Sequence, residues 1–586
     1  MLKLKTLSII VLSFVLLSAT SSAQTVRLKI VETSDVHGAI FPYDFKNDIP
    51  FNYSLAQVQT FVEQERKQNP DGVILLDNGD ILQGQPVVYY YNFEKQDTLH
   101  LLSQVMNYMK YDAAAVGNHD IETGHPVYDK FNSELNFPWL AANAINTKTD
   151  EPYFKPYSII TRQGVKVAVL GLITPAIPNW LPEDIWKDIF FDDMIKSAKK
   201  WVAIIKREEK PDMIVGLFHS GVDYTYNNET KEKPFNENAA QLVAEQVPGF
   251  DLVFVGHDHK GWNYTVTSSN GKTVLILGTK SEARTAAAAD VLLEFDKSTG
   301  IWEKKITGSI LNVGTYKPDS TFISKFNYGF SQTRTYVNKE LCILGKTITT
   351  RDALLGPSYF TDLIHRFQLD ITDADVSFAA PLSFDAELKK GKIYVRDMFE
   401  LYKYENLLYT VKLSGKEIKD YLEYSYGLWY NTMRNKNDDL LLFKTNSDGK
   451  KELKNQYYNF SSAAGINYSV DVTKLIGSRI NIISMSSGQP FYSDSTYLVA
   501  INSYRGNGGG GHLITGAKIP KEELQKRIVK TTNKDLRFYL MRWMMEKKLV
   551  VPKFEKNCSV IPKDFFWKGR KRAYKDLFPK KQKSGI

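Results

Sequence analysis

The sequence predicts an α/β protein of two domains joined by a helix, and three observations carry this prediction. The chain has 586 residues, more than one ordinary core needs and enough for two or three domains. Over about 26–296, short apolar runs alternate with segments of helical spacing, which is typical of a layered α/β domain. From 341 onward the pattern changes to mixed helices and strands with fewer histidines, which indicates a second α/β or α+β domain.

The first 23 residues have the features of an export signal. Lys3 and Lys5 form a basic start, an apolar run follows over 7–17, and small residues over 21–23 precede an expected mature start at Gln24. The run is short for a membrane span, which takes about 20 apolar residues; an uncleaved anchor is the alternative. We therefore expect an exported protein, periplasmic or secreted, without a transmembrane segment.

Cysteine content and charge exclude some classes of protein. Cys342 and Cys558 are too few for a disulfide framework, and the sequence leaves open whether they pair. The formal charge is +9 at pH 7, and much of the excess lies in a basic tail over 568–583. We expect this tail to be a solvated terminus rather than a membrane or nucleic-acid contact. No nucleic-acid polymer is expected as a partner, and the oligomeric state stays open.

The first domain is expected over 24–320, and its elements follow in order. Because ligands of open α/β sheets bind beyond the carboxyl ends of strands, polar residues that follow these strands are candidates for function. Predicted strands cover 28–32, 73–76, 113–116, 167–173, 213–218, 252–255 and 274–277, and predicted helices cover 55–68, 101–110, 194–208 and 238–246.

A linker helix is expected over 321–340, a segment rich in Lys, Asn, Ser and Tyr with helical spacing. The second domain is then expected over 341–586, including the basic tail. Its predicted helices cover 359–367, 395–402, 415–424 and 536–548, and its predicted strands cover 375–378, 407–413, 467–472 and 497–502.

Five polar clusters stand where predicted strands of the first domain end, at 34–38, 77–80, 117–120, 219–221 and 256–259. His, Asp and Asn side chains bind Zn²⁺, Mn²⁺ or Fe²⁺ without a thiolate. In an extended segment, the spacing of Asp35 and His37 places both side chains on one side, and His257 and His259 share this spacing. A carboxylate can bridge two ions, and Asp80 is the best candidate for that role. The clusters hold five of the nine histidines, namely His37, His119, His219, His257 and His259.

In this order and spacing, the clusters resemble the calcineurin-like metallophosphoesterase pattern. With the export signal and the large second half, the chain resembles the 5'-nucleotidase / 2',3'-cyclic-nucleotide phosphodiesterase family over nearly its whole mature length. The resemblance implies a four-layer α/β/β/α first domain and a centre of two divalent ions, Zn²⁺, Mn²⁺ or similar. It assigns Asp35, His37 and His259 to one ion, Asn118, His219 and His257 to the other, and Asp80 to both.

The resemblance also implies a catalytic histidine, His119. A leaving ribose oxygen needs a proton or a positive neighbour, which a charged imidazole supplies. The acidic partner in the family stands three residues further on, which is Glu122 in this chain, and Asp120 is the alternative. The two ions would lower the pKa of a bound water, and the resulting hydroxide would attack phosphorus while His119 assists the leaving group.

In the family, the second domain stacks the substrate base between two aromatic side chains. Such stacking is worth roughly 1–3 kcal/mol per base. Phe460 and Tyr504 match the two aromatics, Tyr458 is a substitute for the first, and Asn507 beside Tyr504 is a further candidate for substrate contact. The implied partner is a small nucleotide.

Two departures from the family pattern bear on the substrate. Gly508, Gly509 and Gly510 stand where 5'-nucleotidases commonly have Gly-Gly-Asp, whose Asp binds the ribose hydroxyls, and 378–384 lacks the usual Arg. The missing carboxylate suits a phosphate on the 2'- and 3'-oxygens. We therefore expect hydrolysis of 2',3'-cyclic nucleotides and 3'-nucleotides. The alternatives are a 5'-nucleotidase or UDP-sugar hydrolase, a hydrolase of non-nucleotide esters, and a non-catalytic binding protein on this scaffold.

Overall fold

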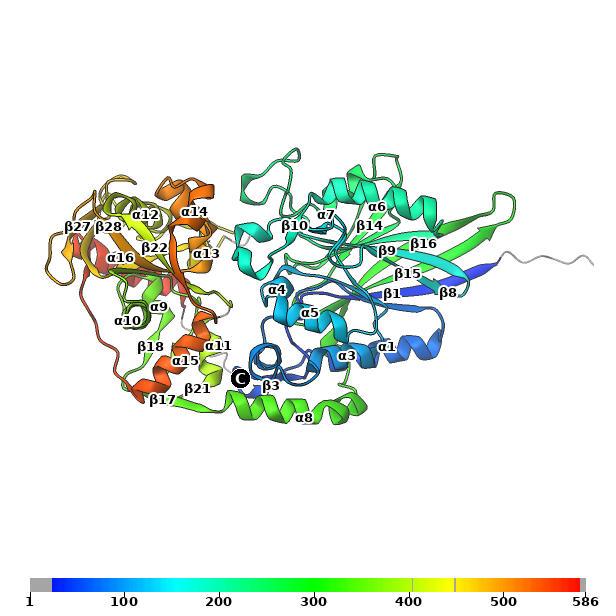
Figure 1. The fold of residues 1–586 in the computed structure, drawn as a ribbon, viewed down its shortest axis with the longest axis horizontal. Helices are drawn as coiled ribbons and strands as arrows, with labels where there is room; N and C mark the ends of the chain where they lie inside the picture. Colours follow the sequence, from blue (N-terminus) through cyan, green and yellow to red (C-terminus); the bar gives the residue numbers. More distant parts are fainter. Residues whose placement is uncertain (1–23, 403, 447–448, 580–586) are drawn as a thin grey trace, which may run out of the picture.

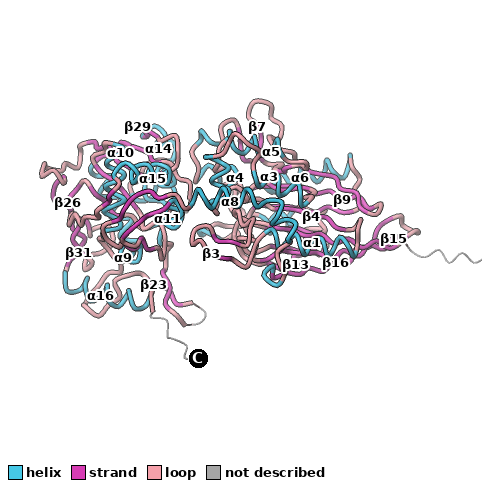
Figure 2. The backbone as a smooth tube through the Cα atoms, turned by 90° about the horizontal axis from the view of Figure 1, so that it is seen from below, coloured by secondary structure: helices cyan, strands magenta, loops and turns pink. Residues whose placement is uncertain are grey.

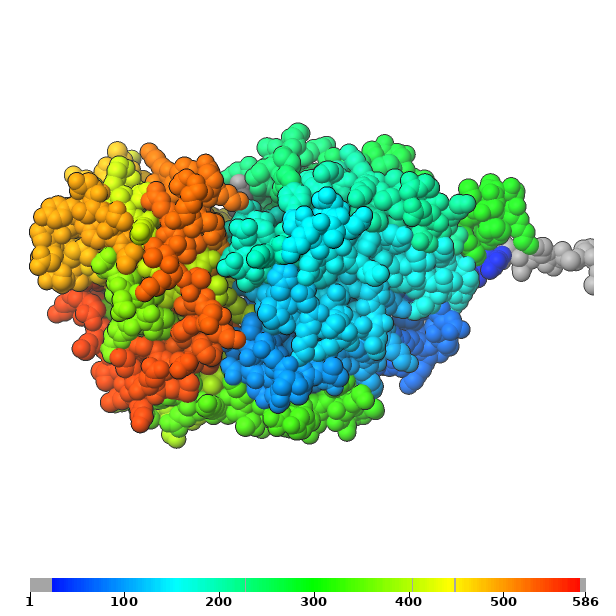
Figure 3. Space-filling model, viewed as in Figure 1, coloured from blue at the N-terminus to red at the C-terminus, as the bar shows by residue number. Residues whose placement is uncertain are grey.

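The computed structural model describes residues 24–402, 404–446 and 449–579, which form two lobes (Figure 1). The expected export signal over 1–23 lies outside the described residues. Within the described part of the chain, no helix is long and apolar enough to span a membrane. The two lobes meet along a broad face in the space-filling view (Figure 3).

Two six-stranded sheets make up the N-terminal lobe, with strand orders β16-β15-β1-β4-β5-β6 and β13-β14-β12-β11-β9-β8. Their central strands run parallel, so their carboxyl ends meet at one edge. The bounds are β1 Thr25–Thr33, β4 Val73–Asp77, β5 Ala113–Ala115, β6 Trp139–Leu140, β15 Thr285–Asp296 and β16 Ile301–Asn312 in the first sheet, and β8 Tyr157–Arg162, β9 Val165–Ile173, β11 Met213–His219, β12 Leu252–Val255, β13 Trp262–Thr267 and β14 Thr273–Gly278 in the second.

Alternation of side chains along the strands builds a core on each face of each sheet. In β4, Ile74 and Leu76 lie in the core between the two sheets, whereas Leu75 lies in the core beneath the helices. In β11, Leu217 lies between the sheets and Phe218 packs towards the helices of the other side. Because both faces are covered, these strands read as continuous apolar runs in the sequence.

Helices close both outer faces of the sheet pair. Residues of α1 (Leu55–Gln68), α3 (Leu101–Met109) and α5 (His125–Glu134) share a core with the first sheet, and those of α6 (Met194–Glu208) and α7 (Ala240–Gln246) share one with the second. The expected four-layer α/β/β/α arrangement is therefore confirmed. Capping side chains set the helix starts: Ser54 accepts from the N–H of Ala56 at α1, and Asp193 accepts from the N–H of Lys196 at α6.

Helix α8, Ser320–Val337, occupies the segment where a linker helix was expected. It runs along the lower side of the N-terminal lobe towards the boundary with the other lobe (Figures 1 and 2). Phe322 and Phe326 are buried and join the core beneath the first sheet. The helix is thus packed onto the N-terminal lobe, and the chain then enters β17, Glu340–Leu344, of the second lobe.

A five-stranded sheet of order β25-β19-β28-β22-β29 lies at the centre of the C-terminal lobe. One face packs against α12, and the other packs against α10, α11 and α15, so this lobe is also α/β. The bounds are β19 Val376–Ala379, β22 Leu408–Ser414, β25 Ser462–Ala464, β28 Thr496–Asn502, β29 Ile528–Thr531, α10 Tyr359–Thr372, α11 Val395–Leu401, α12 Gly415–Trp429 and α15 Leu536–Lys547.

The basic tail is not a free terminus over its described part. Residues Lys563–Leu577 form helix α16, in which Phe566 and Ala573 are buried against the C-terminal core. Arg570 donates to Asp352 at 2.7 Å, which ties the helix to a neighbouring segment. The expectation of a solvated terminus is therefore wrong for this segment, because its apolar side chains recur at helical spacing beneath the lysines and arginines. The remaining basic residues over 580–586 lie outside the described residues.

Both cysteines are unpaired. Cys342 is buried in β17, and Cys558 is partly buried at the start of β31, Cys558–Ile561. Burial raises the pKa of each thiol to about 11. The described fold therefore holds together without a disulfide.

Candidate metal centre and substrate cavity

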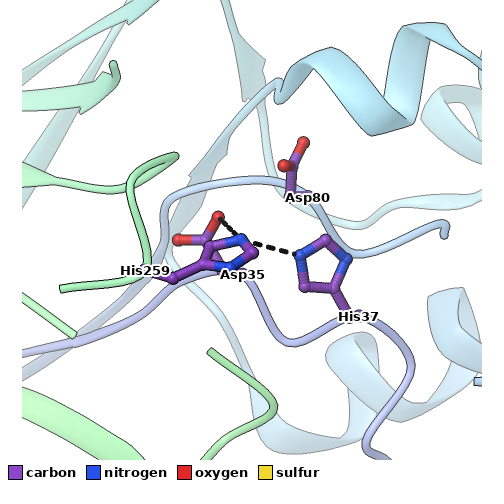
Figure 4. A group of neighbouring side chains, drawn as sticks. All are labelled: Asp35, His37, Asp80 and His259. Carbon is purple, nitrogen blue, oxygen red and sulfur yellow. Dashed lines mark hydrogen bonds and ion pairs between the residues drawn. The ribbon is translucent and has the colours of Figure 1, made fainter. Parts of the chain in front are cut away.

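The polar clusters meet at the edge where the central strands of both sheets end. Two groups of potential ligand atoms form there, and within each group the atoms lie within 4.8 Å of one another. Figure 4 shows Asp35, His259 and His37 facing one another, with Asp80 beside them. Asp80 belongs to both groups. The first group is Asp35, His37, Asp80 and His259, and the second is Asp80, His219 and His257.

Left-handed backbone turns, not extended segments, aim these side chains. The φ angle is positive at five candidate ligands, so the premise that 35–37 and 257–259 are extended is wrong. Asp, Asn and His tolerate this region better than other side chains, yet each such residue still costs of order 1–3 kcal/mol. Strain of this kind persists where the surroundings fix the backbone, as at a binding site. The φ values are Asp35 51°, His37 47°, Asp80 57°, His257 75° and His259 59°.

In the first group, two imidazoles face each other through nitrogen. Nε2 of His37 lies 3.1 Å from Nε2 of His259, which is itself 3.3 Å from Oδ1 of Asp35. Nδ1 of His37 lies 2.9 Å from the carbonyl oxygen of Gln83, so Nδ1 carries the proton of the neutral ring. The lone pair of Nε2 is therefore directed at the other ligand atoms.

The second group repeats this arrangement around His219. Its Nδ1 donates to the carbonyl oxygen of Asn78 at 2.6 Å. Its Nε2 faces two oxygens, Oδ1 of Asn118 at 3.1 Å and Oδ2 of Asp80 at 3.2 Å. Because Nδ1 already donates to Asn78, Nε2 of His219 meets these acceptors only through a second proton or a bound cation. Lone pairs that converge in this way need a cation, and a divalent metal ion fits the N and O donor set.

The pKa shifts of His219 and Asp80 in the metal-free centre also indicate that the site requires positive charge. Burial alone would lower the pKa of His219, but the negative charge of Asp80 overrides it and raises the pKa to about 9. Burial alone would raise the pKa of Asp80, but the positive charge of His219 holds it well below its usual value. Both shifts favour positive charge between the ligands.

Glu237 extends the second group outward, and no sequence pattern indicated it. Nδ1 of His257 lies 2.8 Å from Oδ1 of Asn118, and its Nε2 lies 3.2 Å from Oε1 of Glu237. A carboxylate that accepts the outer N–H of a ligating histidine fixes the tautomer and the ring orientation. Glu237 follows no strand and belongs to no polar cluster, which is why pattern reasoning missed it.

Beside the ligands, His119 pairs with Glu122 and not with Asp120. Nδ1 of His119 lies 2.5 Å from Oε2 of Glu122. Asp120 instead accepts backbone N–H groups, including that of Gly117 at 2.8 Å and that of Asp80 at 3.0 Å. It therefore holds the loop that carries Asp80, and of the two candidate partners only Glu122 contacts the histidine.

A cavity of about 740 Å³ opens between the two lobes next to these ligands. Asn118, His119 and His257 line it from the N-terminal lobe. Four tyrosines line it from the C-terminal lobe, Tyr402, Tyr404, Tyr458 and Tyr504. The ring centroid of Tyr458 lies 6.4 Å from those of both Tyr404 and Tyr504. Tyr504 and Asn507 were expected at the cavity, whereas Tyr404 was not found from the sequence.

Phe460 does not lie at this cavity, contrary to expectation. Its ring is 2% exposed and belongs to the core of the C-terminal lobe. It stacks on Trp429 with ring centroids 5.2 Å apart and planes 9° apart, and its edge meets Tyr426. Tyr458, the substitute, has its ring at the cavity. Tyr458 lies in a short helical turn, Tyr457–Asn459, that ends at Phe460, and the sequence could not tell which ring turns inward.

The structure explains why position 510 of this chain is a glycine. Its φ is +69°, and an added Cβ would collide with Nη1 of Arg505. Arg505 is buried and donates to Oδ1 of Asn459 at 2.9 Å and to the carbonyl oxygen of Tyr458 at 2.6 Å. The guanidinium thus occupies the space of a side chain at 510 and joins two loops of the cavity wall.

Comparisons with known proteins show which protein families the two lobes resemble. The sequence model of the family described as calcineurin-like phosphoesterase matches residues 28–261, and that of the 5'-nucleotidase, C-terminal domain, matches residues 336–517. The chain therefore combines a calcineurin-like phosphoesterase domain with a 5'-nucleotidase-type C-terminal domain. It is a phosphoric ester hydrolase of the kind that uses divalent metal ions.

Several relatives match over much of the chain. A protein named 2',3'-cyclic-nucleotide 2'-phosphodiesterase/3'-nucleotidase from Yersinia enterocolitica is 26% identical, over 86% of this chain and 84% of its own length. Trifunctional nucleotide phosphoesterase protein YfkN from Bacillus subtilis is 28% identical over 92% of this chain, but this chain spans only 39% of it. Protein UshA from Salmonella pullorum is 30% identical over 48% of this chain and 46% of its own.

Solved structures share the fold. A putative 5'-nucleotidase from Staphylococcus aureus superimposes with a TM-score of 0.74 at 23% identity, covering 91% of this chain and all of that one. A 5'-nucleotidase precursor from Thermus thermophilus gives 0.59 at 20% identity, over 92% of this chain and all of its own. At these identities the likeness concerns the arrangement of both lobes.

A Glu237→Gln substitution tests the outer contact of His257. Gln keeps the size but loses the charge, and such changes typically weaken metal affinity roughly 10–100-fold. We expect this loss in a competition titration of Zn²⁺ against a chelator, with an unchanged melting temperature of the metal-free protein. Glu229→Gln, at another acid of the cavity wall, is the matched control. Equal affinities of the Glu237→Gln variant and the wild type would contradict the assignment.

Proposed function

We propose that this chain hydrolyses phosphate esters of nucleotides at a centre of two divalent ions and prefers 2',3'-cyclic nucleotides and 3'-nucleotides. The observation that carries the proposal is the adjacency of two features. The cavity has candidate metal ligands, Asn118 and His257, on one wall and four tyrosines on the other. Its volume of about 740 Å³ falls in the range of about 300–1,000 Å³ usual for small-molecule sites.

The candidate ligands divide into two sets that share one carboxylate. Asp80 would lie between the ions, because its two oxygens face different neighbours: Oδ2 lies 3.2 Å from Nε2 of His219, and Oδ1 accepts the N–H of His119 at 2.8 Å. Bound Zn²⁺ or Mn²⁺ would supply an activated water and neutralise the phosphate oxygens. One set would be Asp35, His37 and His259, and the other Asn118, His219 and His257.

His119 is the residue proposed to assist the leaving group. Burial alone would lower the pKa of His119, but the charges of Asp80 and Glu122 raise it to about 10. The pairing of Nδ1 with Glu122 favours the charged form of the ring, which lines the cavity beside Asn118. A charged imidazole there stabilises the negative charge that develops on the leaving ribose oxygen and donates the proton. Glu122 holds the ring through Nδ1.

The C-terminal wall of the cavity supports the choice of substrate. Its described lining residues include four asparagines and four tyrosines but no carboxylate. A carboxylate there would suit free 2'- and 3'-hydroxyls and would repel a phosphate attached to them. Gly510, where a side chain would collide with Arg505, keeps an acid out of this wall. The relatives from three genera that match most of the chain are named for the cyclic and 3' activities. The asparagines are Asn406, Asn459, Asn502 and Asn507.

Export is proposed on the sequence of residues 1–23 alone. The basic start, the short apolar run and the small residues before Gln24 are typical of a signal peptide. Secretion of the full-length chain, followed by N-terminal sequencing of the product, tests this proposal: a mature start at Gln24 supports it.

A substrate panel tests the proposed activity. The purified mature protein is stripped with a chelator, reloaded with Mn²⁺ or Zn²⁺, and assayed on 2',3'-cyclic AMP, 3'-AMP, 5'-AMP and a UDP-sugar. We expect metal-dependent turnover with the highest kcat/KM on the first two. Preference for 5'-AMP or the UDP-sugar would contradict the argument from the C-terminal wall. Absence of turnover on all four would contradict nucleotide hydrolysis itself.

Paired substitutions separate the ring at the cavity from the ring in the core. Tyr504→Ala removes a stacking surface, which is worth roughly 1–3 kcal/mol per base, so we expect a KM for 3'-AMP raised about 5–150-fold with little loss of stability. Phe460→Ala instead leaves a hole in the core and should cost about 3–5 kcal/mol of unfolding free energy. Denaturant titrations and steady-state kinetics of both variants give the answer. A stable Phe460→Ala variant with a raised KM would instead indicate that Phe460 stacks on the substrate base.

A further inference from the structure

A cluster of three ionisable side chains is buried at the boundary between the lobes, away from the candidate ligands. Arg537 lies between two carboxylates: its Nη1 is 3.7 Å from Oε1 of Glu405 and 3.6 Å from Oδ2 of Asp535. The side chains of Arg537, Glu405 and Asp535 are 2%, 3% and 6% exposed, respectively. A buried ion cluster is expensive in desolvation and weak evidence for stability, so its presence at this place calls for another role.

The cluster is fixed to both lobes. Tyr89, at the end of α2 (Pro86–Tyr89) in the N-terminal lobe, donates its hydroxyl to Oδ1 of Asp535 at 3.1 Å. The guanidinium of Arg537 lies over the ring of Tyr89, 4.8 Å from its centroid, and over the ring of Phe399 at 4.3 Å. Arg537 is thus held between an aromatic ring of each lobe, in a position that a planar guanidinium fills and an ammonium does not.

From this cluster a direct path leads to the catalytic pair. The backbone N–H of Glu405 donates to Oε1 of Glu122 at 3.2 Å. The other carboxylate oxygen, Oε2, lies 2.5 Å from Nδ1 of His119. Each oxygen of Glu122 therefore has one partner, a histidine from its own lobe and a backbone amide from the other. The ring of the preceding residue, Tyr404, lies nearly parallel to that of His119, with centroids 6.2 Å apart.

Loss of Arg537 would disturb this path in a defined way. Arg537 also donates through Nε and Nη2 to the carbonyl oxygen of Tyr402, at 3.1 and 2.6 Å. A lysine ammonium has no planar fork with which to make these contacts and face both acids, so Glu405 and Asp535 would lose partners in buried surroundings, which is strongly unfavourable. The segment that carries Glu405 would shift to separate them, and Glu122 would lose its amide donor.

We propose that Arg537 is a positioning residue for the His119–Glu122 pair: it holds Glu405 of the C-terminal lobe so that the Glu405 amide fixes the second oxygen of Glu122. The proposal rests on the proposed function, in which His119 assists departure of the ribose oxygen. It assigns to the C-terminal lobe a part in the chemical step, in addition to binding of the base. Tyr89 secures the arrangement from the N-terminal lobe through Asp535.

The test compares Arg537→Lys with Arg479→Lys in the metal-loaded, full-length mature protein. Arg479 is a matched control, since it is equally buried in the C-terminal lobe and donates to the carbonyl oxygens of Tyr430 and Lys474, but contacts neither Glu405 nor Glu122. Since acid–base catalysis contributes about 10²–10⁴-fold, we expect Arg537→Lys to lower kcat on 3'-AMP roughly 10–100-fold with KM within about threefold. Arg479→Lys should leave both constants unchanged.

The leaving group distinguishes positioning from general damage. p-Nitrophenolate departs without a proton, so kcat of Arg537→Lys on p-nitrophenyl phosphate should stay within about threefold of the wild type if the variant acts through His119. In a Glu122→Gln background, Arg537→Lys should cause little further loss, because residues that act through one group are not additive. Equal losses on both substrates, or additive losses in the double variant, would overturn the proposal.

Further outcomes keep this proposal separate from the proposed function. A wild-type protein without metal-dependent turnover of 3'-AMP would refute the function, whereas normal turnover by Arg537→Lys would refute only the positioning role. If Arg537→Lys does not fold, the Tyr89→Phe variant tests the positioning role instead, because it removes one hydroxyl and retains the ring under the guanidinium. A kcat on 3'-AMP lowered about 3–10-fold, with p-nitrophenyl phosphate spared, would support the proposal; an unchanged kcat would overturn it.

Discussion

The carboxylate of Asp80 is the interaction on which the rest of the site depends. It belongs to both groups of candidate ligands, and its neighbours are arranged to keep it in place. The N–H of His119 donates to Oδ1, and Asp120 accepts the N–H groups of Asp80, Ile81 and Leu82. Gly117 is required beside it, since an added Cβ would collide with Oδ1. A carboxylate shared by both groups would fix the spacing of two cations, and positive charge placed there would offset the converging lone pairs that surround it.

The two lobes contribute chemically different groups to the cavity. The N-terminal lobe contributes the candidate metal ligands from the ends of parallel strands, where left-handed turns bring them together. The C-terminal lobe contributes rings and amides, with Arg505 joining two loops of the cavity wall. The boundary is not a passive contact. A buried arginine, two carboxylates and a tyrosine hydroxyl tie the lobes together, and from there a single backbone amide reaches Glu122.

Much of this architecture follows from the sequence, for identifiable reasons. Strands covered on both faces, such as β4 and β11, are unbroken apolar runs, and helices α1 and α6 begin at the capping residues Ser54 and Asp193, so the layers were predictable. The candidate metal ligands were predictable as well, because they directly follow these strands. Glu237, Tyr404 and Arg537 were not, since each acts through a partner distant in sequence. Phe460 was misplaced because neighbouring aromatic residues of a short turn read alike, and only packing against Trp429 decides which ring is buried.

Electron paramagnetic resonance of the Mn²⁺-loaded mature protein, combined with metal analysis, tests the central claim most directly. If Asp80 joins two sites, the protein takes up about two Mn²⁺ per chain, and their spectrum is that of a spin-coupled pair about 3.5–4 Å apart. Replacement of Asp80 by Ala should abolish the coupling while the lobes stay folded. Uptake of one ion per chain with the spectrum of isolated Mn²⁺ would contradict the account of a shared carboxylate.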